Sequence, residues 1–356
     1  MSKYSFLDDY SEGCHPNILK AMAETNMAQQ TAYGNDEYSA QARDAIRAHL
    51  GDSASDAAVY FVASGTLANL IILASALRAH ESVIAVSSGH IELRETGAIE
   101  ATGHKILTTP PVDGKLTVAG LKSVLASNSH FPHMTRPRVV YISNATETGT
   151  IYTKAELQAL SEVCKANNLL LMLDGARLAT ALTAERNDLS LQDIAELTDI
   201  FWLGGTKTGA LLGEAIVIPN PQLAIDFDFH IKQRGALLAK GRLLGLQFAE
   251  LFKNDLIFEL ATTANRLAQK LAKAVTDNGY TLAADTESNQ IFPILPNILI
   301  EHLQQQFAFY VWEKLDDQQS VIRLVTSWAT DETQVDAFIE ALSIDLSIIG
   351  KLWLRL

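Results

Sequence analysis

The sequence predicts an α/β protein, with a large domain built on a doubly wound, mostly parallel sheet and a smaller α+β domain at its carboxyl end. With 356 residues, 48% of them hydrophobic, the chain can bury one large core and a second, smaller one. Short strand-like runs alternate with helical ones through the first two thirds. These strand-like runs are apolar throughout, which is typical of strands covered on both faces.

The strands of the large domain follow one another at regular intervals, with helical segments between them. The runs AVYFVA, SVIAV and HKILTT precede the helical segments TLANLIILASALRAH, IELRETGAIEATG and LTVAGLKSVLAS, respectively. RVVYIS, LLLMLD, DIFWLGG and EAIVI continue the series. This alternation predicts a parallel sheet with helices on both faces. We expect an N-terminal arm at 1–15, a large domain at 16–235 and a small domain at 236–356.

The pattern changes after about residue 236. A long helix is predicted around 255–278, followed by short strands near QIFPILP, FAFYVWEKL and VIRLVTSW and by a closing helix. The apolar residues of the closing helix share one face at helical spacing; they are Val335, Phe338, Ile339, Leu342, Leu346 and Ile349. The aromatic residues of this domain are best interpreted as core.

The charge and the cysteine content restrict the partners of the protein. The net charge is −13 and no Lys/Arg block offsets it, which argues against binding to nucleic acid or to an anionic membrane. The longest apolar stretches are too short to span a bilayer. With two cysteines and no signal-like start, we expect a cytoplasmic protein whose partners are small molecules or copies of itself.

An acid and an amine end two neighbouring predicted strands. LLLMLD ends in Asp174, and Lys207 follows 33 residues later (207 − 174) in FWLGGTKTGA. A desolvated lysine near cations can form a Schiff base, and a buried carboxylate can keep the ring nitrogen of pyridoxal phosphate protonated. The pair therefore predicts a pyridoxal phosphate site. The alternative is that Asp174 only caps a helix and Lys207 is a solvated loop residue.

Two further segments at predicted strand ends carry suitable side chains. Ser64, Gly65 and Thr66 lie between a strand and a helix, where backbone N–H groups and hydroxyls could hold a phosphate. An ordinary helix cap is the alternative. His90 follows the SVIAV strand and could stack on a pyridine ring and transfer protons, or could be a hydrogen-bonded loop residue.

Glu147 and Arg177 complete the candidate site. Glu147 follows the VVYIS strand, and Arg177 lies three residues after Asp174. The arginine could hold the cofactor's phenolate oxygen or a substrate carboxylate, or could form a surface ion pair. No metal ion is expected.

An ordered set of motifs resembles a known family. YGND (33–36), ASGTLAN (63–69), HIELRETGA (90–98), LDGARLATA (173–181), GGTKTGA (204–210) and IRLVTSW (322–328) are similar, in order, to those of low-specificity L-threonine aldolases and β-eliminating lyases. This resemblance implies a pyridoxal-phosphate-dependent enzyme with the aspartate-aminotransferase-like fold.

The resemblance also implies roles for the cofactor-facing residues. Lys207 would form the Schiff base and Asp174 would pair with the ring nitrogen. His90 would stack on the ring, while Gly65 and Thr66 would hold the phosphate.

The resemblance further implies how substrate is bound. Arg177 would lie beside the phenolate oxygen or the substrate, and Arg323 would bind the substrate carboxylate. Tyr33 would line the site from the N-terminal region. The implied assembly is a homodimer or homotetramer with sites at the subunit interface.

The chain departs from the family pattern at three positions. Glu147 stands where relatives carry a histidine thought to act on the substrate hydroxyl. Asp8 replaces a serine that contacts the substrate carboxylate in relatives; it is expected in the substrate site, but an acid there would repel a carboxylate, so Asp8 either points elsewhere or the substrate differs. Lys240 stands in for an arginine that supports the phosphate across the interface. Its ammonium group is a point charge and cannot make the paired hydrogen bonds of a guanidinium.

The expected reaction is cleavage of a threonine-like β-hydroxy-α-amino acid to glycine and an aldehyde. Either His90 or Glu147 would remove the hydroxyl proton. β-Elimination or transamination at the same cofactor remains an alternative. A non-catalytic or nucleotide-binding α/β protein is a more distant one, because GGTKTG lacks the spacing of a P-loop.

Overall fold

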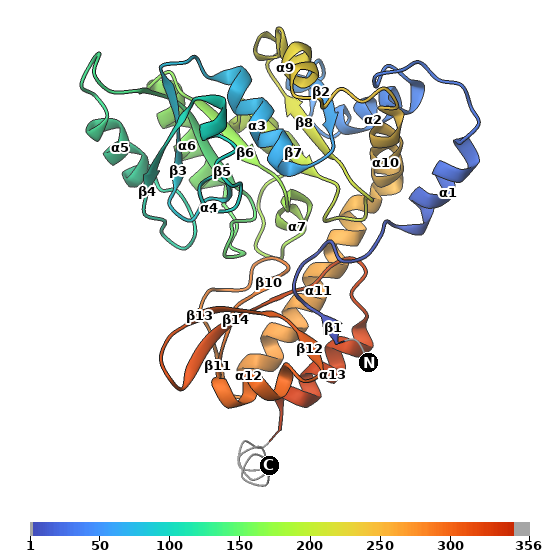
Figure 1. The fold of residues 1–356 in the computed structure, drawn as a ribbon, viewed down its shortest axis with the longest axis vertical. Helices are drawn as coiled ribbons and strands as arrows, with labels where there is room; N and C mark the ends of the chain where they lie inside the picture. Colours follow the sequence, from blue (N-terminus) through green and yellow to red (C-terminus); the bar gives the residue numbers. More distant parts are fainter. Residues whose placement is uncertain (1–2, 345–356) are drawn as a thin grey trace.

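The computed structural model describes residues 3–344. Figure 1 shows a large α/β unit above a smaller unit, with one long helix, α11, joining them. Within the described residues, no helix combines the length and apolar character needed to cross a membrane.

The large unit contains a seven-stranded sheet in the order β2-β8-β7-β6-β5-β3-β4. Its strands are β2 (Ala58–Val62), β3 (Glu81–Val86), β4 (Lys105–Thr109), β5 (Arg136–Ser143), β6 (Leu170–Asp174), β7 (Ile200–Gly204) and β8 (Glu214–Ile218). β8 is antiparallel to both β2 and β7, and the other neighbours are parallel. The mostly parallel sheet and its strand series are confirmed.

Both faces of this sheet are buried, as the apolar runs indicated. Along β6, Leu171 and Leu173 belong to one hydrophobic cluster, whereas Leu170 and Met172 belong to another on the opposite face. The first cluster includes residues of α1 (Pro16–Thr25), α2 (Glu37–Arg47), α5 (Val118–Ser127), α6 (Lys154–Ala166), α7 (Leu178–Leu182), α8 (Leu191–Leu197) and α10 (Arg242–Phe252). The second includes α3 (Gly65–Ala76) and α9 (Phe227–Gln233). The sheet is therefore doubly wound.

The helix predicted over IELRETGAIEATG is wrong. Only α4 (His90–Leu93) is helical there, followed by a 3₁₀ turn at Glu100–Thr102. Thr96 and Gly97 take positive φ values of 53° and 74°, which interrupt a right-handed helix. This irregular turn allows the side chain of Glu95 to be buried.

The small unit is α+β, as predicted. It contains β9 (Thr281–Leu282), β10 (Gln290–Ile291), β11 (Pro293–Pro296), β13 (Tyr310–Lys314) and β14 (Gln319–Val325) in one sheet, with α12 (Asn297–Leu303) and α13 (Glu332–Leu342). Val335, Phe338 and Leu342 of α13 are buried on its inner face. Ile339 is partly buried against the same core, and the predicted Leu346 and Ile349 lie outside the described residues.

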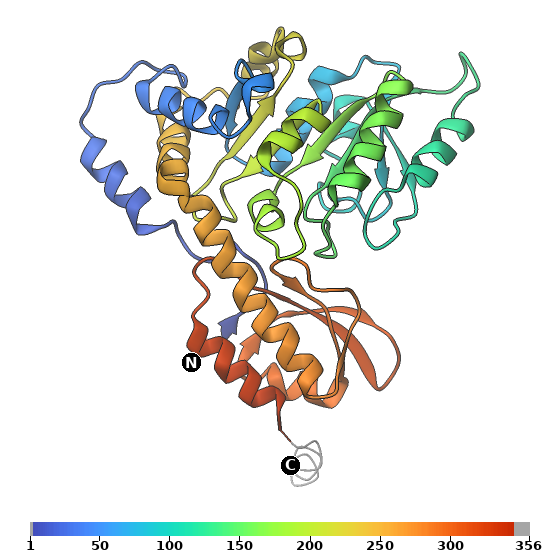
Figure 2. The ribbon, with the colours of Figure 1, turned by 180° about the vertical axis from the view of Figure 1, so that it is seen from behind.

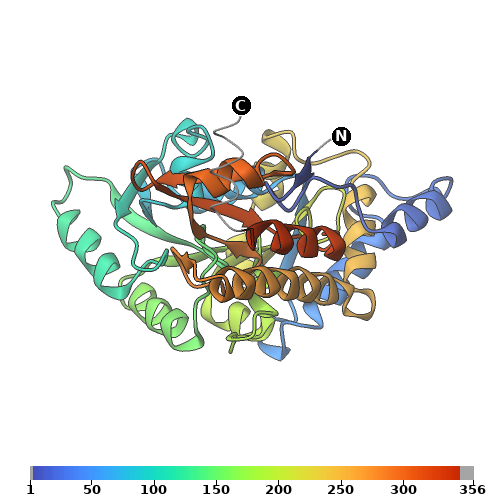
Figure 3. The ribbon, with the colours of Figure 1, turned by 90° about the horizontal axis from the view of Figure 1, so that it is seen from below.

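The N-terminal segment and α11 connect the two units. β1 (Tyr4–Ser5) pairs with β12 (Phe307–Ala308), and Phe6 is in the small unit's core. α11 (Leu256–Asp277) begins in the large unit's core, at Ile257, and ends in the small unit's core, at Val275. Figures 2 and 3 show this helix from behind and from below. The chain thus leaves the large unit inside α11, later than the boundary proposed at 235/236.

Glycines let the ends of β6 and β7 approach each other. A Cβ added at Gly175, directly after Asp174, would lie 1.8 Å from the carbonyl oxygen of Trp202. A Cβ at Gly204 would lie 2.4 Å from the carbonyl oxygen of Ala176. The backbone at these strand ends therefore tolerates no side chain.

We predict that Gly175→Ala lowers the free energy of unfolding by about 3 kcal/mol, because rigid backbone must move to accept the methyl group. Urea denaturation measures this change. Gly13→Ala is the matched control, since no heavy atom lies within 4 Å of a Cβ at that position. Equal stability of the two variants would contradict the close approach.

Candidate active site

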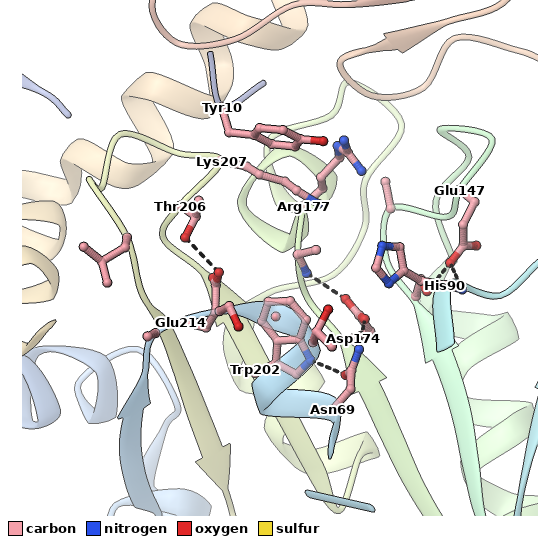
Figure 4. Close-up of a pocket in the computed structure, with 18 of the residues that line it drawn as sticks. Tyr10, Asn69, His90, Glu147, Asp174, Arg177, Trp202, Thr206, Lys207 and Glu214 are labelled. Carbon is pink, nitrogen blue, oxygen red and sulfur yellow. Dashed lines mark hydrogen bonds between the residues drawn. The ribbon is translucent and has the colours of Figure 1, made fainter. Parts of the chain in front are cut away.

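A cavity of about 400 Å³ opens at the edge of the large sheet where β3, β5, β6 and β7 end and the antiparallel β8 begins. It brings together the sequence-predicted residues Ser64, Gly65, Thr66, His90, Glu147, Asp174, Arg177 and Lys207 (Figure 4). Tyr10, Asn69, Ser143, Trp202, Thr206 and Glu214, which the sequence interpretation did not select, also line it.

Asp174 is buried and accepts hydrogen bonds on both carboxylate oxygens. Oδ2 accepts from Asn69 Nδ2 at 2.9 Å and from the Tyr141 hydroxyl at 2.6 Å. Oδ1 accepts from the backbone N–H of Ala176 at 3.0 Å, in the turn before α7. The N-cap of α7 is Arg177, so the alternative interpretation, in which Asp174 only caps a helix, is wrong. Burial and the nearby charges of Asp174 and Glu147 raise the pKa of Tyr141 well above its ordinary value, so the phenol remains a donor.

Asn69 links Asp174 to His90. Its Nδ2 also donates to Glu95 Oε1 at 2.8 Å, and its Oδ1 accepts from Trp202 Nε1 at 3.0 Å. His90 Nδ1 lies 2.9 Å from the same Glu95 oxygen. Because a carboxylate accepts, Nδ1 carries the proton in neutral His90 and Nε2 keeps the lone pair.

Glu147 lies beside His90 at the cavity wall. Its Oε1 accepts from the backbone N–H of His90 at 3.0 Å and from the Ser143 hydroxyl at 2.7 Å. Burial raises the pKa of Glu147, and the hydroxyl bond from Ser143 only partly offsets this effect. Glu147 therefore holds a proton up to a higher pH than an exposed glutamate.

Lys207 lies on the loop between β7 and β8, partly buried, and is not the solvated residue of the alternative interpretation. Burial and the charge of Arg177 lower the pKa of its ammonium group. The carboxylates of Asp9, Asp174 and Glu214 oppose this shift. The net direction favours the neutral, nucleophilic amine.

Arg177 forms a buried ion pair and not a surface one. Its Nε and Nη2 donate to the two oxygens of Asp9 at 2.7 and 3.0 Å, and Asn289 donates to Asp9 at 2.9 Å. Although burial alone would raise the pKa of Asp9, the charges of Arg177 and Lys207 hold it below its ordinary value. Asp9 gave no signal in the sequence that distinguished it from its neighbour.

The three residues predicted to hold a phosphate, Ser64, Gly65 and Thr66, lie at the start of α3. Ser64 is the N-cap, and its hydroxyl accepts from the backbone N–H of Leu67 at 3.3 Å, so the helix-cap interpretation is correct for this side chain. Gly65 and Thr66 line the cavity beside it. A Cβ at Gly65 would lie 2.7 Å from Trp202, so the indole leaves room only for glycine.

Asp8 and Arg323 do not line the cavity. Asp8 accepts from the Ser11 hydroxyl at 2.8 Å in a local turn, which corrects its predicted position: its neighbour Asp9 is the acid that reaches the site. Arg323 lies between the rings of Tyr310 and Trp312. Burial and the charge of Arg177 lower its pKa.

Tyr33 and Lys240 also lie away from this cavity within one chain. Tyr33 is 46% exposed beneath the ammonium group of Lys232, and its backbone N–H donates to the carbonyl of Ala239. Lys240 is exposed. The roles predicted for both involve a second subunit and stay predictions.

Some signals for the missed residues were present in the sequence. Asn69 and Glu95 belong to the quoted motifs ASGTLAN and HIELRETGA, three residues after Thr66 and five after His90, respectively. Tyr141 and Trp202 sit in apolar strands and resemble ordinary core residues.

The chain is similar to known proteins over most of its length. Residues 6–306 match the model of the β-eliminating lyase family. The chain is 36% identical over 335 residues to the low specificity L-threonine aldolase of Pseudomonas aeruginosa, covering 92% of this chain and 93% of the relative. The solved threonine aldolase of Leishmania major is 50% identical, with a TM-score of 0.93, covering 95% of this chain and 98% of that one. The aspartate aminotransferase of Thermus thermophilus, 12% identical with a TM-score of 0.68 over 96% of this chain and 91% of that one, shares the fold.

We predict that Asp9→Asn destabilises the protein by about 3 kcal/mol near neutral pH, because it leaves the buried Arg177 guanidinium unpaired. The folded pKa of Asp9 is depressed, so its contribution is present above the unfolded carboxyl pKa of about 3.9 and is lost as pH falls through the folded pKa. Urea denaturation at several pH values should show the difference between wild type and variant shrinking in acid. A difference that does not vary with pH would contradict the assignment.

Proposed function

The chain belongs to the β-eliminating lyase family, and from this premise we propose that it is a pyridoxal-phosphate-dependent lyase that cleaves threonine-like amino acids to glycine and an aldehyde. The observation that carries the proposal is the convergence of Asp174 and Lys207 on one cavity at the end of the sheet. The similarity to threonine aldolases over nearly the whole chain supports the choice of reaction.

The cavity residues fit pyridoxal phosphate. Lys207, with a lowered pKa, suits attachment to an aldehyde, and the buried Asp174 suits a protonated ring nitrogen. Gly65 and Thr66 at the N-terminus of α3 suit a phosphate, and His90 suits contact with the ring face. The bound cofactor would supply an electron sink for the carbanion that remains when the substrate's Cα–Cβ bond breaks.

Glu147 is proposed as the base that removes the proton of the substrate hydroxyl. Its second oxygen, Oε2, is left for the substrate, because the His90 N–H and the Ser143 hydroxyl both bond to Oε1. His90 Nε2 is the alternative acceptor. Glu147 accepts the proton only in its ionised form, so its raised pKa places the acidic limit of activity above that of an ordinary carboxylate.

Arg323 is the proposed partner of the substrate carboxylate: it does not line the cavity, but it lies close enough to the lining residues Arg177 and Tyr10 for their charges to act on it. Arg177 is already engaged in two bonds to Asp9, whereas the buried Nε of Arg323 has no partner among the residues that the structure describes. The guanidinium of Arg323 donates from Nη2 to the carbonyl of Leu7 and rests against two aromatic rings, which fix its orientation. Arg177 is left to orient Asp9 and to lower the pKa of Lys207.

We further propose a cytoplasmic homodimer or homotetramer in which Tyr33 and Lys240 face a neighbouring subunit's site. Large apolar side chains exposed on the single chain support an interface; Met27, Ile225 and Phe229 are 88%, 64% and 74% exposed. Both cysteines are buried and unpaired, which supports a reducing compartment.

We predict that wild-type protein turns yellow with pyridoxal phosphate and converts L-threonine to glycine and acetaldehyde, whereas Lys207→Ala does neither. Lys273→Ala, at an exposed lysine of α11, is the control and should behave as wild type. Absorbance and product analysis measure both outcomes. A keto acid and ammonia as products would instead indicate elimination, and a Lys207→Ala variant indistinguishable from wild type would refute the proposal.

We predict that Glu147→Gln lowers kcat by a factor on the order of 10²–10⁴ while pyridoxal phosphate still binds. Ser143→Ala removes a bond that stabilises the Glu147 carboxylate, so the acidic limb of the pH–rate profile should move to higher pH. Steady-state kinetics over a pH series measures both. If Glu147→Gln keeps wild-type kcat, His90 and not Glu147 is the base.

A further inference from the structure

Glu214 is a buried acid that the proposed mechanism leaves without a role. It is the first residue of β8, 4% exposed, and its backbone pairs with Gly204 at the end of β7. Its side chain lines the same cavity as Lys207 (Figure 4). A buried carboxylate is costly unless donors or a positive charge compensate it, so its contacts indicate its role.

Both oxygens of Glu214 bind the loop that carries Lys207. Oε2 accepts from the backbone N–H of Gly205 at 3.0 Å, and Oε1 accepts from the Thr206 hydroxyl at 2.8 Å. The same hydroxyl oxygen accepts from the backbone N–H of Gly213 at 3.0 Å. The two residues directly before Lys207 are therefore fixed by Glu214 from the opposite side of the loop.

Glu214 is one of three carboxylates whose charges oppose the lowering of the Lys207 pKa, after Asp9 and Asp174. The groups that act on Lys207 are Arg177 before α7, Asp9 of the N-terminal segment, Asp174 of β6 and Glu214. Asp9 also binds Arg177, and Asp174 accepts three hydrogen bonds from other segments. Glu214 differs from both because its two hydrogen-bond donors, Gly205 and Thr206, belong to the loop that carries Lys207.

Glu214 itself responds to Lys207. Burial raises the pKa of Glu214 to about 7, while the Thr206 hydroxyl and the charge of Lys207 act in the opposite direction and the charge of Asp174 adds to the rise. The two groups therefore titrate as a pair, and the charge of one changes the proton affinity of the other.

We infer that Glu214 is a positioning residue for Lys207: it fixes the loop through Gly205 and Thr206 and, as a buried negative charge in the same cavity, helps to hold the proton on the ammonium group until the amine bonds to pyridoxal phosphate. The ammonium group first gives a proton to water. The neutral amine then uses its lone pair to form a bond to the aldehyde carbon, whose oxygen leaves as water. This inference rests on the proposed function, since it concerns the attachment of that cofactor.

The test measures the rate of bond formation between Lys207 and pyridoxal phosphate, by absorbance, as a function of pH in cofactor-depleted full-length protein. Glu214→Gln keeps an acceptor for the Gly205 N–H but removes the negative charge that holds the proton on Lys207. Its pH midpoint should move below that of wild type. Glu214→Ser, a second variant without the charge, should show a shift in the same direction.

Thr206→Val is the matched control for the positional role. It removes the hydroxyl that binds Glu214 but leaves the carboxylate, so we expect a slower reaction at every pH and a smaller shift of the midpoint than in either Glu214 variant. Wild-type midpoints for both Glu214→Gln and Glu214→Ser would overturn the inference and leave the proposed function intact. Failure of wild-type protein to bond to the cofactor at any pH would overturn the proposed function and this inference with it.

Discussion

The buried carboxylate of Asp174 is the constraint on which the site depends. A charge held away from water must be compensated, and three segments supply donors: Asn69 from α3, Tyr141 from β5 and the backbone after β6. Asn69 also donates to Glu95, which bonds to His90, so the position of Asp174 is coupled to the orientation of the imidazole. Asn69 accepts from Trp202 as well, and this bond ties α3 to β7. Asp174, His90 and Glu147 thus belong to one hydrogen-bonded network.

A second network joins the two units of the molecule at the cavity. Arg177 of the large unit binds Asp9 of the N-terminal segment, which accepts from Asn289 of the small unit. Arg323 of β14 donates to the carbonyl of Leu7 in the same segment. The N-terminal segment therefore links the small unit to the cavity, and through Asp9 and Arg177 it also acts on the charge of Lys207.

The sequence predicted the sheet well because a strand buried on both faces leaves an apolar run that solvent-facing strands lack. It also placed Asp174 and Lys207 together, because sheet topology brings strand ends to one edge. It failed over 91–103, where positive φ values at Thr96 and Gly97 break the helix. The sequence interpretation selected Asp8 and not Asp9, because two adjacent acids on an irregular segment differ only in the direction in which their side chains point. Tyr141 was missed because it lies in an apolar strand and its partner Asp174 is distant in sequence.

The central claim is that Lys207 is the amine that holds the cofactor opposite Asp174. Its most direct test is to incubate the protein with pyridoxal phosphate, reduce it with borohydride and locate the modified lysine by mass spectrometry of its peptides. The structure predicts one dominant modification, on Lys207, because burial and the charge of Arg177 lower the pKa of this lysine. A dominant modification on any other lysine, with Lys207 unmodified, would contradict the account.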